Sequence, residues 1–153
     1  ALSMHTEVAK AQVHAVELSP DAYKFSRQNF DRYPGAELLL GDMSDAFNAL
    51  NGSVSVVVSN PPYIPNEMVP IDPEVHLFDP KLALYGGTDG LDVVRVAIAA
   101  ADRLLLRGGL VVIEHADTQS AAVGELLLAE GFIEVRAHKD LNNKDRAVSA
   151  RKG

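Results

Sequence analysis

The chain has 153 residues, of which 47% are hydrophobic and 23% charged, so it is long enough for one globular domain with a sizeable core. Its net charge of −7 argues against a surface that grips nucleic acid through phosphates, and no apolar run approaches the ~20 residues of a membrane-spanning helix. The absence of cysteine excludes disulfides and thiolate metal sites and fits a cytoplasmic protein. We therefore expect no direct nucleic-acid partner, no membrane partner and no metal.

The first third of the chain alternates between helical and strand patterns. Residues 1–8 have the pattern of the end of a helix, and residues 13–17 that of a short strand. Ser19 as N-cap and Pro20 at the first helical position then predict a helix. We expect its apolar side to be formed by Ala22, Phe25 and Phe30.

The middle of the chain contains two further strand patterns and one long irregular stretch. Strands are predicted at residues 37–40 and 54–58, with a short helical turn near residues 44–50 between them. Residues 64–89 are rich in proline and show no clear periodicity. Loops of that length inside a compact domain are usually functional.

The last part of the chain returns to regular alternation. A helix is predicted at residues 90–106 and ended by Gly108-Gly109, and a buried strand follows at residues 110–114. Asp117 is expected to cap a helix that runs to residue 130 and stops at Gly131. Two more strands are expected at residues 132–137 and 147–150.

The alternation of strands and helices predicts an α/β fold with a mostly parallel sheet. Such sheets bind ligands outside the carboxyl ends of their strands. Three polar side chains lie at the ends of predicted strands, namely those of Glu17, Asp42 and Asn60. We expect all three to line the same rim.

Glu17 and Asp42 suit a nucleotide-like ligand, although each has a simpler explanation. An acid in the position of Glu17 accepts hydrogen bonds from ribose hydroxyls in nucleotide-binding α/β folds, but it is also an ordinary residue beside a helix. Asp42 has the chemistry to accept a hydrogen bond from an adenine amino group, but it is equally placed to cap the turn that begins at Ser44. Position alone leaves both alternatives open.

The segment Asn60-Pro61-Pro62-Tyr63 is more specific, and its alternative is a proline-rich surface turn. The side-chain oxygen of Asn60 and the carbonyl of Pro61 are two acceptors that together hold both hydrogens of a planar –NH2 group. Tyr63 adds an aromatic face with a polar tip, and the prolines stiffen the arrangement. The segment contains no titratable base, which favours an electrophile that brings its own activation, such as a sulfonium methyl donor.

At this point the residues resemble a known family. Asn60-Pro61-Pro62-Tyr63 after a strand is similar to the motif of amino-methylating, S-adenosylmethionine-dependent methyltransferases, which include adenine-N6 DNA enzymes and protein-glutamine enzymes. The chain resembles the HemK/PrmC type, the release factor glutamine N5-methyltransferases, at residues 15–19, 41–42, 60–65, 74–75, 79–80, 83–87, 89–91, 113–115 with Gln119, and 139–141 with 145–146. The likeness covers essentially the whole chain.

The resemblance implies a Rossmann-like class I methyltransferase sheet with an antiparallel strand near the C-terminus. It implies that Glu17 holds the ribose of S-adenosylmethionine, that Asp42 and Met43 border the adenine, and that Asn60 lies near the methionyl end of the donor. The implied substrate site and catalytic group consist of Asn60, Pro61, Pro62 and Tyr63. Met43 stands where many members have an aromatic residue.

The implied activity is methylation of the glutamine amide in the Gly-Gly-Gln loop of peptide-chain release factors. Three alternatives stay open: a ribosomal-protein glutamine methyltransferase, an adenine-N6 nucleic-acid methyltransferase and a degenerate binding module. The acidic charge and the absence of a basic target-recognition region count against the nucleic-acid alternative.

The beginning of the chain departs from the family pattern. Such enzymes start this domain with a strand and a Gly-x-Gly-x-Gly type of loop, preceded by a small helical substrate-docking domain, and the 153 residues contain neither. We therefore expect residues 1–153 to be one catalytic domain without its N-terminal part. A missing first strand leaves two strand edges unpaired, and we expect the chain by itself to be inactive.

Overall fold

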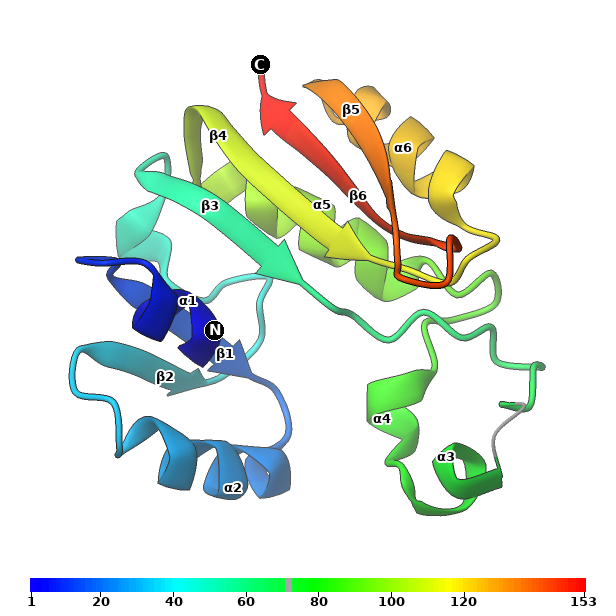
Figure 1. Ribbon diagram of the computed structural model, residues 1–153, viewed down its shortest axis with the longest axis horizontal. Coiled ribbons are helices and arrows are strands. Elements are labelled where there is room, and N and C mark those ends of the chain that lie inside the picture. Colours follow the sequence, from blue (N-terminus) through cyan, green and yellow to red (C-terminus); the bar gives the residue numbers. More distant parts are fainter. Residues whose placement is uncertain (71–72) are drawn as a thin grey trace. The chain divides into compact units, whose positions relative to one another are not determined.

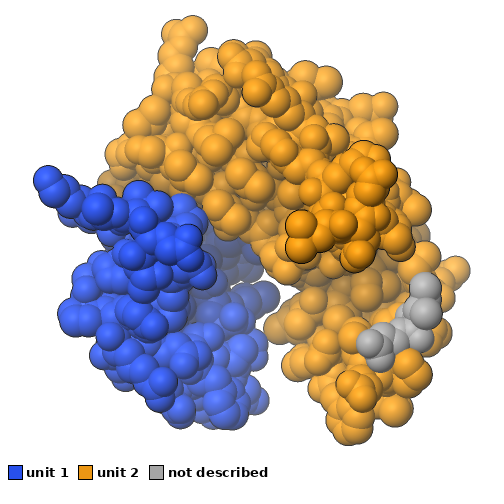
Figure 2. All heavy atoms as spheres, viewed as in Figure 1, with its two compact units in different colours: residues 1–46 blue, residues 47–153 orange. Residues whose placement is uncertain are grey.

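The computed structural model describes residues 1–70 and 73–153, which form two compact units, residues 1–46 and residues 47–153 (Figure 2). Ile71 and Asp72 belong to the loop predicted at residues 64–89 and lie outside the described residues. Among the described residues each unit has its own sheet, with two strands in the first and four in the second. The expectation of a single catalytic domain over residues 1–153 stays a prediction.

The first unit is a pair of parallel strands with two helices (Figure 1). Its elements are, in chain order, α1 (Leu2–Glu7), β1 (Val13–Glu17), α2 (Pro20–Phe30) and β2 (Ala36–Leu40). Ser19 caps α2 as predicted, because its hydroxyl oxygen accepts a hydrogen bond from the Ala22 N–H at 3.3 Å. The buried apolar side chains of this unit are Val13, Phe30, Leu38 and Ala46.

Two side chains of α2, those of Ala22 and Phe25, do not face the core as expected, because both residues are exposed. Phe30 is 8% exposed, whereas Phe25 is 69% exposed. Phe25 and Phe30 are five positions apart, which turns the helix by roughly 140° at ~100° per residue. The prediction of Ala22 and Phe25 on the buried apolar side was therefore wrong.

The second unit is built on a four-stranded sheet with the order β3-β4-β6-β5 (Figure 1). Its elements are β3 (Val54–Ser59), α3 (Pro73–Phe78), α4 (Lys81–Leu84), α5 (Asp92–Leu104), β4 (Leu105–Glu114), α6 (Ser120–Ala129), β5 (Phe132–Lys139) and β6 (Asp145–Lys152), with a 3-10 turn at Asn48–Leu50. β3 and β4 are parallel, and β6 runs antiparallel to both β4 and β5. The predicted α/β sheet with an antiparallel strand near the C-terminus is confirmed.

A single apolar core joins the sheet to α5 and α6, which cover the same face (Figure 1). Val94 and Ala101 of α5 and Leu127 of α6 are fully buried against Val111 and Ile113 of β4. Burial of this apolar surface is the main favourable contribution to the stability of the unit. Among the described residues, β3 pairs only with β4 and β1 only with β2, in agreement with the expected pair of unpaired strand edges.

Several boundaries differ from those expected from the sequence. α5 ends at Leu104, two residues before the predicted end of the helix, and β4 begins directly at Leu105. Gly108 and Gly109 therefore lie inside β4 rather than after a helix. The pairing of β3 with β4 is interrupted there, and Gly108 takes a φ of +78°, a conformation that favours glycine. The apolar pattern of α5 runs on into the strand, so periodicity alone did not show the change.

The long loop and the start of α6 also differ from expectation. The loop contains the short helices α3 and α4, which have six and four residues and are too short for a periodic apolar pattern. Gln119, not Asp117, is the N-cap residue of α6. Gly131 follows the helix with a φ of +95°, so its predicted role as the C-terminal stop is confirmed.

Candidate functional site

Residues 60–63 leave the carboxyl end of β3, where the sequence places the candidate site. Asn60 is exposed, Pro61 is buried, and Pro62 and Tyr63 are half-buried. Among the described residues, no group donates a hydrogen bond to the Asn60 side chain or to the Pro61 carbonyl. The two oxygen acceptors considered for an –NH2 group therefore have no protein partner in the part of the chain that the structure describes.

The backbone that follows this segment is held by the segment around α4. The Ile64 N–H donates to the Leu84 carbonyl at 2.9 Å, and the Gly86 N–H donates back to the Ile64 carbonyl at 2.9 Å. The Asn66 N–H donates to the Gly87 carbonyl, also at 2.9 Å. These bonds satisfy backbone groups that a helix or a sheet would otherwise pair, and they fix the path of the chain.

Two glycines allow the close approach of these segments. A Cβ atom on Gly86 would lie 2.5 Å from the Pro62 carbonyl oxygen, and one on Gly90 would lie 2.3 Å from the Tyr63 carbonyl oxygen. Gly90 also has a φ of +76°, which glycine adopts without strain. Residues 86–90 form the turn that leads into α5, in which Asp89 Oδ1 accepts a hydrogen bond from the Leu91 N–H at 2.9 Å.

Gln119 also contacts the candidate segment, a contact that the sequence reasoning did not predict. Its side chain is buried, with the residue 8% exposed, and its Nε2 donates to the Tyr63 carbonyl at 3.0 Å. The same nitrogen lies 3.4 Å from the Asp89 carbonyl oxygen, and Oε1 accepts from the Ala116 N–H at 3.0 Å. The only signal in the sequence was the place of Gln119 in a family motif, which gave it no role.

The start of β6 adds a cation near Tyr63. Burial would lower the pKa of Arg146, but its hydrogen bond to Asp140 and the negative charges of Asp140, Glu114 and, where it is ionised, Tyr63 raise the pKa above its ordinary value. The guanidinium lies 3.3 Å from the Asp140 carboxylate and forms an ion pair with it. Arg146 is therefore held cationic by its ion pair with Asp140.

Glu17 and Asp42 lie at the ends of the two neighbouring strands of the first unit. The Glu17 Oε1 accepts a hydrogen bond from the Ser19 N–H at 2.8 Å, and the Asp42 Oδ1 accepts one from the Ser44 N–H at 2.8 Å. The backbone N–H and hydroxyl of Ser44 hold the pKa of Asp42 below its usual range. The Gly41 N–H donates to the Glu17 carbonyl at 3.0 Å, so the two acids follow adjacent strand ends.

These contacts agree with the simpler explanations of both acids and leave room for the ligand role. Each carboxylate uses one oxygen to cap the turn that follows it. The Glu17 Oε2 has no recorded partner among the described residues. Met43, half-buried, follows Asp42. The structure brings Glu17, Asp42 and Met43 together in the first unit and residues 60–63 together in the second, and the expectation of one shared rim stays a prediction.

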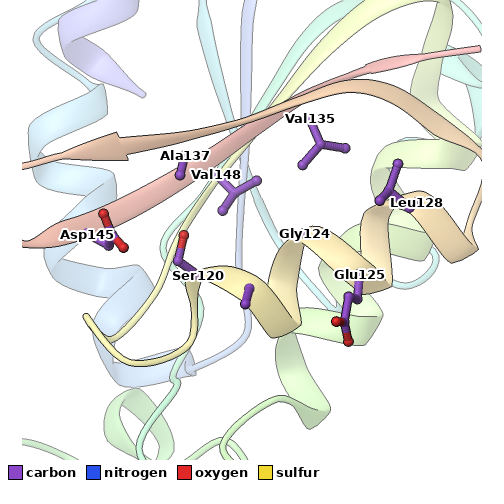
Figure 3. A pocket seen from close by; sticks show the side chains of 9 residues that line it. Ser120, Gly124, Glu125, Leu128, Val135, Ala137, Asp145 and Val148 are labelled. Atoms are coloured by element: carbon purple, nitrogen blue, oxygen red, sulfur yellow. The ribbon is translucent and has the colours of Figure 1, made fainter.

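A cavity of about 440 Å³ lies between α6 and the hairpin of β5 and β6 (Figure 3). Its lining residues are Ser120, Ala121, Gly124, Glu125, Leu128, Val135, Ala137, Asp145 and Val148. None of the predicted site residues is among them. The candidate site is therefore separate from this cavity.

Residues 1–70 and 73–153 contain no group of three or more His, Asp or Glu side chains placed to hold a metal ion. None of their helices is long and apolar enough to cross a membrane.

No protein-family model matches the chain. The chain is 47% identical to the release factor glutamine methyltransferase of Streptomyces coelicolor, over 99% of this chain and 54% of the relative. It is 40% identical to that of Corynebacterium glutamicum, over 93% of this chain and 52% of the relative. It is also 42% identical, over 86% of this chain and 44% of the relative, to the 4-amino-L-phenylalanine/4-methylamino-L-phenylalanine methyltransferase of Streptomyces pristinaespiralis.

Solved structures share the fold at low sequence identity. A methyltransferase from Pyrococcus furiosus aligns with a TM-score of 0.70 at 19% identity, over 99% of this chain and 68% of that one. The Mtq2-Trm112 complex of E. cuniculi, described as responsible for the methylation of the eRF1 translation termination factor, aligns with a TM-score of 0.53 at 17% identity, over 99% of this chain and 93% of that one.

The strand order, the antiparallel β6 and these solved structures define the class: this is a chain with the Rossmann-like fold of class I methyltransferases. Within that class, nearly the whole chain is similar to release factor glutamine methyltransferases, and it spans about half the length of the curated relatives it matches. The HemK/PrmC-type resemblance inferred from the motifs is thereby confirmed.

Proposed function

We propose that this protein transfers a methyl group from S-adenosylmethionine to the side-chain amide nitrogen of the glutamine in the Gly-Gly-Gln loop of peptide-chain release factors. The observation that carries the proposal is the pair of oxygens at the end of β3, the exposed Asn60 side chain and the Pro61 carbonyl, which accept no hydrogen bond from a described group. The names of the relatives at 40–47% identity support the choice of substrate.

The two oxygens act by holding both hydrogens of the glutamine –NH2 group. An amide nitrogen is a weak nucleophile because its lone pair is delocalised into the carbonyl. Acceptors on both N–H groups favour the state in which this nitrogen gains positive charge, so they stabilise the transition state more than the ground state. Tyr63 and Pro62 then provide the wall against which the glutamine side chain packs. After transfer the methylated nitrogen is acidic, and its extra proton passes to solvent water.

The residues of the first unit fit the methyl donor by their chemistry. S-adenosylmethionine supplies an electrophilic methyl carbon when it is bound. We assign the ribose hydroxyls to Glu17, whose Oε1 is fixed by the Ser19 N–H while Oε2 has no recorded partner in the described part of the chain. We assign the adenine edge to Asp42 and Met43, because they follow the neighbouring strand end. Both acids are oriented by the backbone before a ligand arrives.

We propose that residues 1–153 are the methyl-transfer part of the enzyme and that the reaction takes place in the cytoplasm, where peptide release occurs. It requires no metal and no direct nucleic-acid contact. The acidic charge of −7 supports this choice of a protein rather than a nucleic-acid substrate.

A second candidate function follows from one relative. The methyltransferase of Streptomyces pristinaespiralis is named for 4-amino-L-phenylalanine, whose amino group is attached to an aromatic ring, and it is 42% identical to this chain. Two acceptors at the end of β3 suit an aromatic –NH2 group as well as a carboxamide. A small aromatic amine is therefore the rival substrate.

The test is methyl transfer by the full-length polypeptide that includes residues 1–153, with labelled S-adenosylmethionine. The substrates are a release factor, the same factor with the glutamine of its Gly-Gly-Gln loop changed to alanine, 4-amino-L-phenylalanine and double-stranded DNA. We expect label only in the unchanged release factor. Label in the amino acid alone would establish the rival, and equal labelling of both release factors or labelling of DNA would overturn the proposal.

A further inference from the structure

We propose that Gln119 is a positioning residue for this reaction, because its carboxamide fixes the backbone at Tyr63 and so holds the Asn60 and Pro61 oxygens at the spacing of an –NH2 group. This inference rests on the proposed function and names a residue of the same site. Gln119 itself is not placed against the substrate or the donor.

The hydrogen bonds of Gln119 tie together three separate segments. Its Nε2 donates to Tyr63, 56 residues away in the sequence, at 3.0 Å. It also lies 3.4 Å from the carbonyl oxygen of Asp89, which is 30 residues away. Its Oε1 accepts from the Ala116 N–H just after β4, at 3.0 Å. The end of β3, the turn before α5 and the end of β4 therefore meet at one buried side chain.

The simpler role for a polar residue at this position is to cap α6. Gln119 is the N-cap residue of that helix, but its side chain makes no capping hydrogen bond. Ser, Thr, Asp and Asn cap helices through a short side chain that turns back to the N2 or N3 amide, and Gln is not among them. The side chain is directed instead to carbonyl groups of other segments, so helix stability does not explain the choice of glutamine.

Only a carboxamide satisfies all three partners. It offers two N–H donors and an acceptor oxygen, whereas a carboxylate offers no donor and a thioether neither donates nor accepts well. Gln119 is 8% exposed, so a lost donor leaves the carbonyl groups of Tyr63 and Asp89 poorly satisfied in a buried place. The segment is then expected to move to find other partners.

A displacement of Tyr63 also displaces the Asn60 and Pro61 oxygens, because the backbone between them is stiff. Pro61 and Pro62 fix two of the φ angles between Asn60 and Tyr63. Gly86 and Gly90 admit no Cβ beside this segment, so the surroundings are already tight. A misplacement of ~1 Å at a positioning contact lowers turnover by about 10²-fold.

The experiment compares Gln119→Met and Gln119→Glu with the same two changes at Gln28, an exposed glutamine of α2. It uses the full-length polypeptide with saturating release factor and donor. We expect Gln119→Met to lower kcat by about 10- to 100-fold while the Kd for S-adenosylmethionine changes less than about twofold, and to speed amide exchange at Ile64 and Gly86. The Gln28 variants are expected to match the wild type in all three measurements.

Gln119→Glu adds a readout that a merely structural role would not give. Burial and two facing carbonyl oxygens raise the pKa of the introduced carboxyl group, and its protonated form regains one donor for Tyr63. The kcat of this variant relative to the wild type is therefore expected to rise as the pH is lowered from about 9 to about 6, within the upward range of shifted carboxyl pKa values. If Gln119→Met does not fold, the pH dependence of the Gln119→Glu to wild-type kcat ratio decides whether Gln119 is a positioning residue.

Two results would overturn the inference: a folded Gln119→Met variant with the kcat of the wild type, or a Gln119→Glu ratio that is constant with pH. Failure of the proposed function is distinguishable from both. If the wild-type protein methylates an aromatic amine instead, the same kinetic measurements apply to that substrate. If it transfers no methyl group at all, amide exchange at Ile64 and Gly86 decides by itself whether Gln119 holds the segment.

Discussion

The two groups of candidate residues are fixed by different kinds of contact. Glu17 and Asp42 are each oriented by the backbone N–H of the residue two positions further along the chain. Residues 60–63, in contrast, are followed by a backbone held by Leu84 and Gly86, and Tyr63 is held by a side chain 56 residues away. The first group depends on local turns, and the second depends on the folding of its whole unit.

The unit that holds residues 60–63 also has the larger apolar core of the two units. Among the described residues, the buried apolar side chains of the first unit are Val13, Phe30, Leu38 and Ala46. The second unit has a continuous core that joins α5, α6, β4, β5 and β6. Local opening is easiest where few apolar contacts must be broken, so we expect residues 60–63 to be the more rigid group.

The largest effect on activity is expected from Asn60→Ala. The change removes one of the two acceptors for the –NH2 group, and loss of one preorganised transition-state contact lowers kcat by about 10²- to 10³-fold. The Kd for S-adenosylmethionine is expected to stay within about threefold, since the contact forms mainly in the transition state. Single-turnover rates and donor titration measure the two quantities.

The matched control for Asn60→Ala is Asn66→Ala. Asn66 is exposed in the same connection, and the hydrogen bond recorded for it uses only its backbone N–H. Equal losses of turnover and donor affinity in Asn60→Ala would contradict the assigned role, and so would a comparable loss of turnover in Asn66→Ala.

A matched pair of leucines tests the difference between the cores. Leu127 is fully buried in the second unit, and Leu38 is 6% exposed in the first. We expect Leu127→Ala to reduce the free energy of unfolding by about 2–5 kcal/mol, and Leu38→Ala by the lower end of that range, because fewer apolar neighbours surround it. Urea unfolding measures both values.

Amide exchange sharpens the comparison of the two leucines. Leu127→Ala is expected to speed exchange at Ile64 and Gly86, whose bonds depend on the second unit. Leu38→Ala is expected to act mainly on the amides of β1 and β2. A larger loss of stability in Leu38→Ala would show that the first unit is not the less protected part.

A smaller effect is expected from Glu17→Gln. The amide oxygen keeps the hydrogen bond from the Ser19 N–H, so the turn is preserved while the charge is lost. Replacing a charged by a neutral acceptor weakens a hydrogen bond by about 1 kcal/mol, which predicts a roughly fivefold weaker donor affinity with kcat nearly unchanged. Glu7→Gln in α1, an exposed position, is the control. Unchanged donor affinity with reduced kcat would remove Glu17 from the donor site.

The sequence predicted those features that depend on neighbouring residues. The bounds of β1 and the cap of α2 at Ser19 follow from short-range patterns, and both were confirmed. The start of β4 at Leu105 was missed because its pairing with Val54 replaces a helix whose apolar pattern continues. The role of Gln119 was missed because its partners are carbonyl groups 30 and 56 residues away. Every residue has a backbone carbonyl group, so no pattern of residue types shows which carbonyl groups a side chain will contact.

The smallest predicted effect concerns the turn that leads into α5. In this turn the Asp89 carboxylate accepts hydrogen bonds from the Arg95 guanidinium and from the Leu91 N–H. These bonds lower the pKa of Asp89 from 3.8 to about 2. The unfolded state therefore takes up the proton first as the pH falls, so the stabilisation is complete above about pH 4 and is lost between about pH 4 and pH 2. Because Asp89 is half exposed, its contribution is small.

A double-mutant cycle isolates this contribution. Asp89→Asn keeps an acceptor for the Leu91 N–H but loses the ion pair with Arg95, whose Nη2 lies 2.6 Å from Asp89 Oδ2. We expect Asp89→Asn and Arg95→Met to be non-additive in thermal unfolding near pH 6 and closer to additive near pH 2, where about half of the Asp89 carboxylate is protonated. A coupling that is the same at both pH values would show that the pair acts through packing rather than charge. The turn would then be held mainly by its backbone hydrogen bonds and glycines.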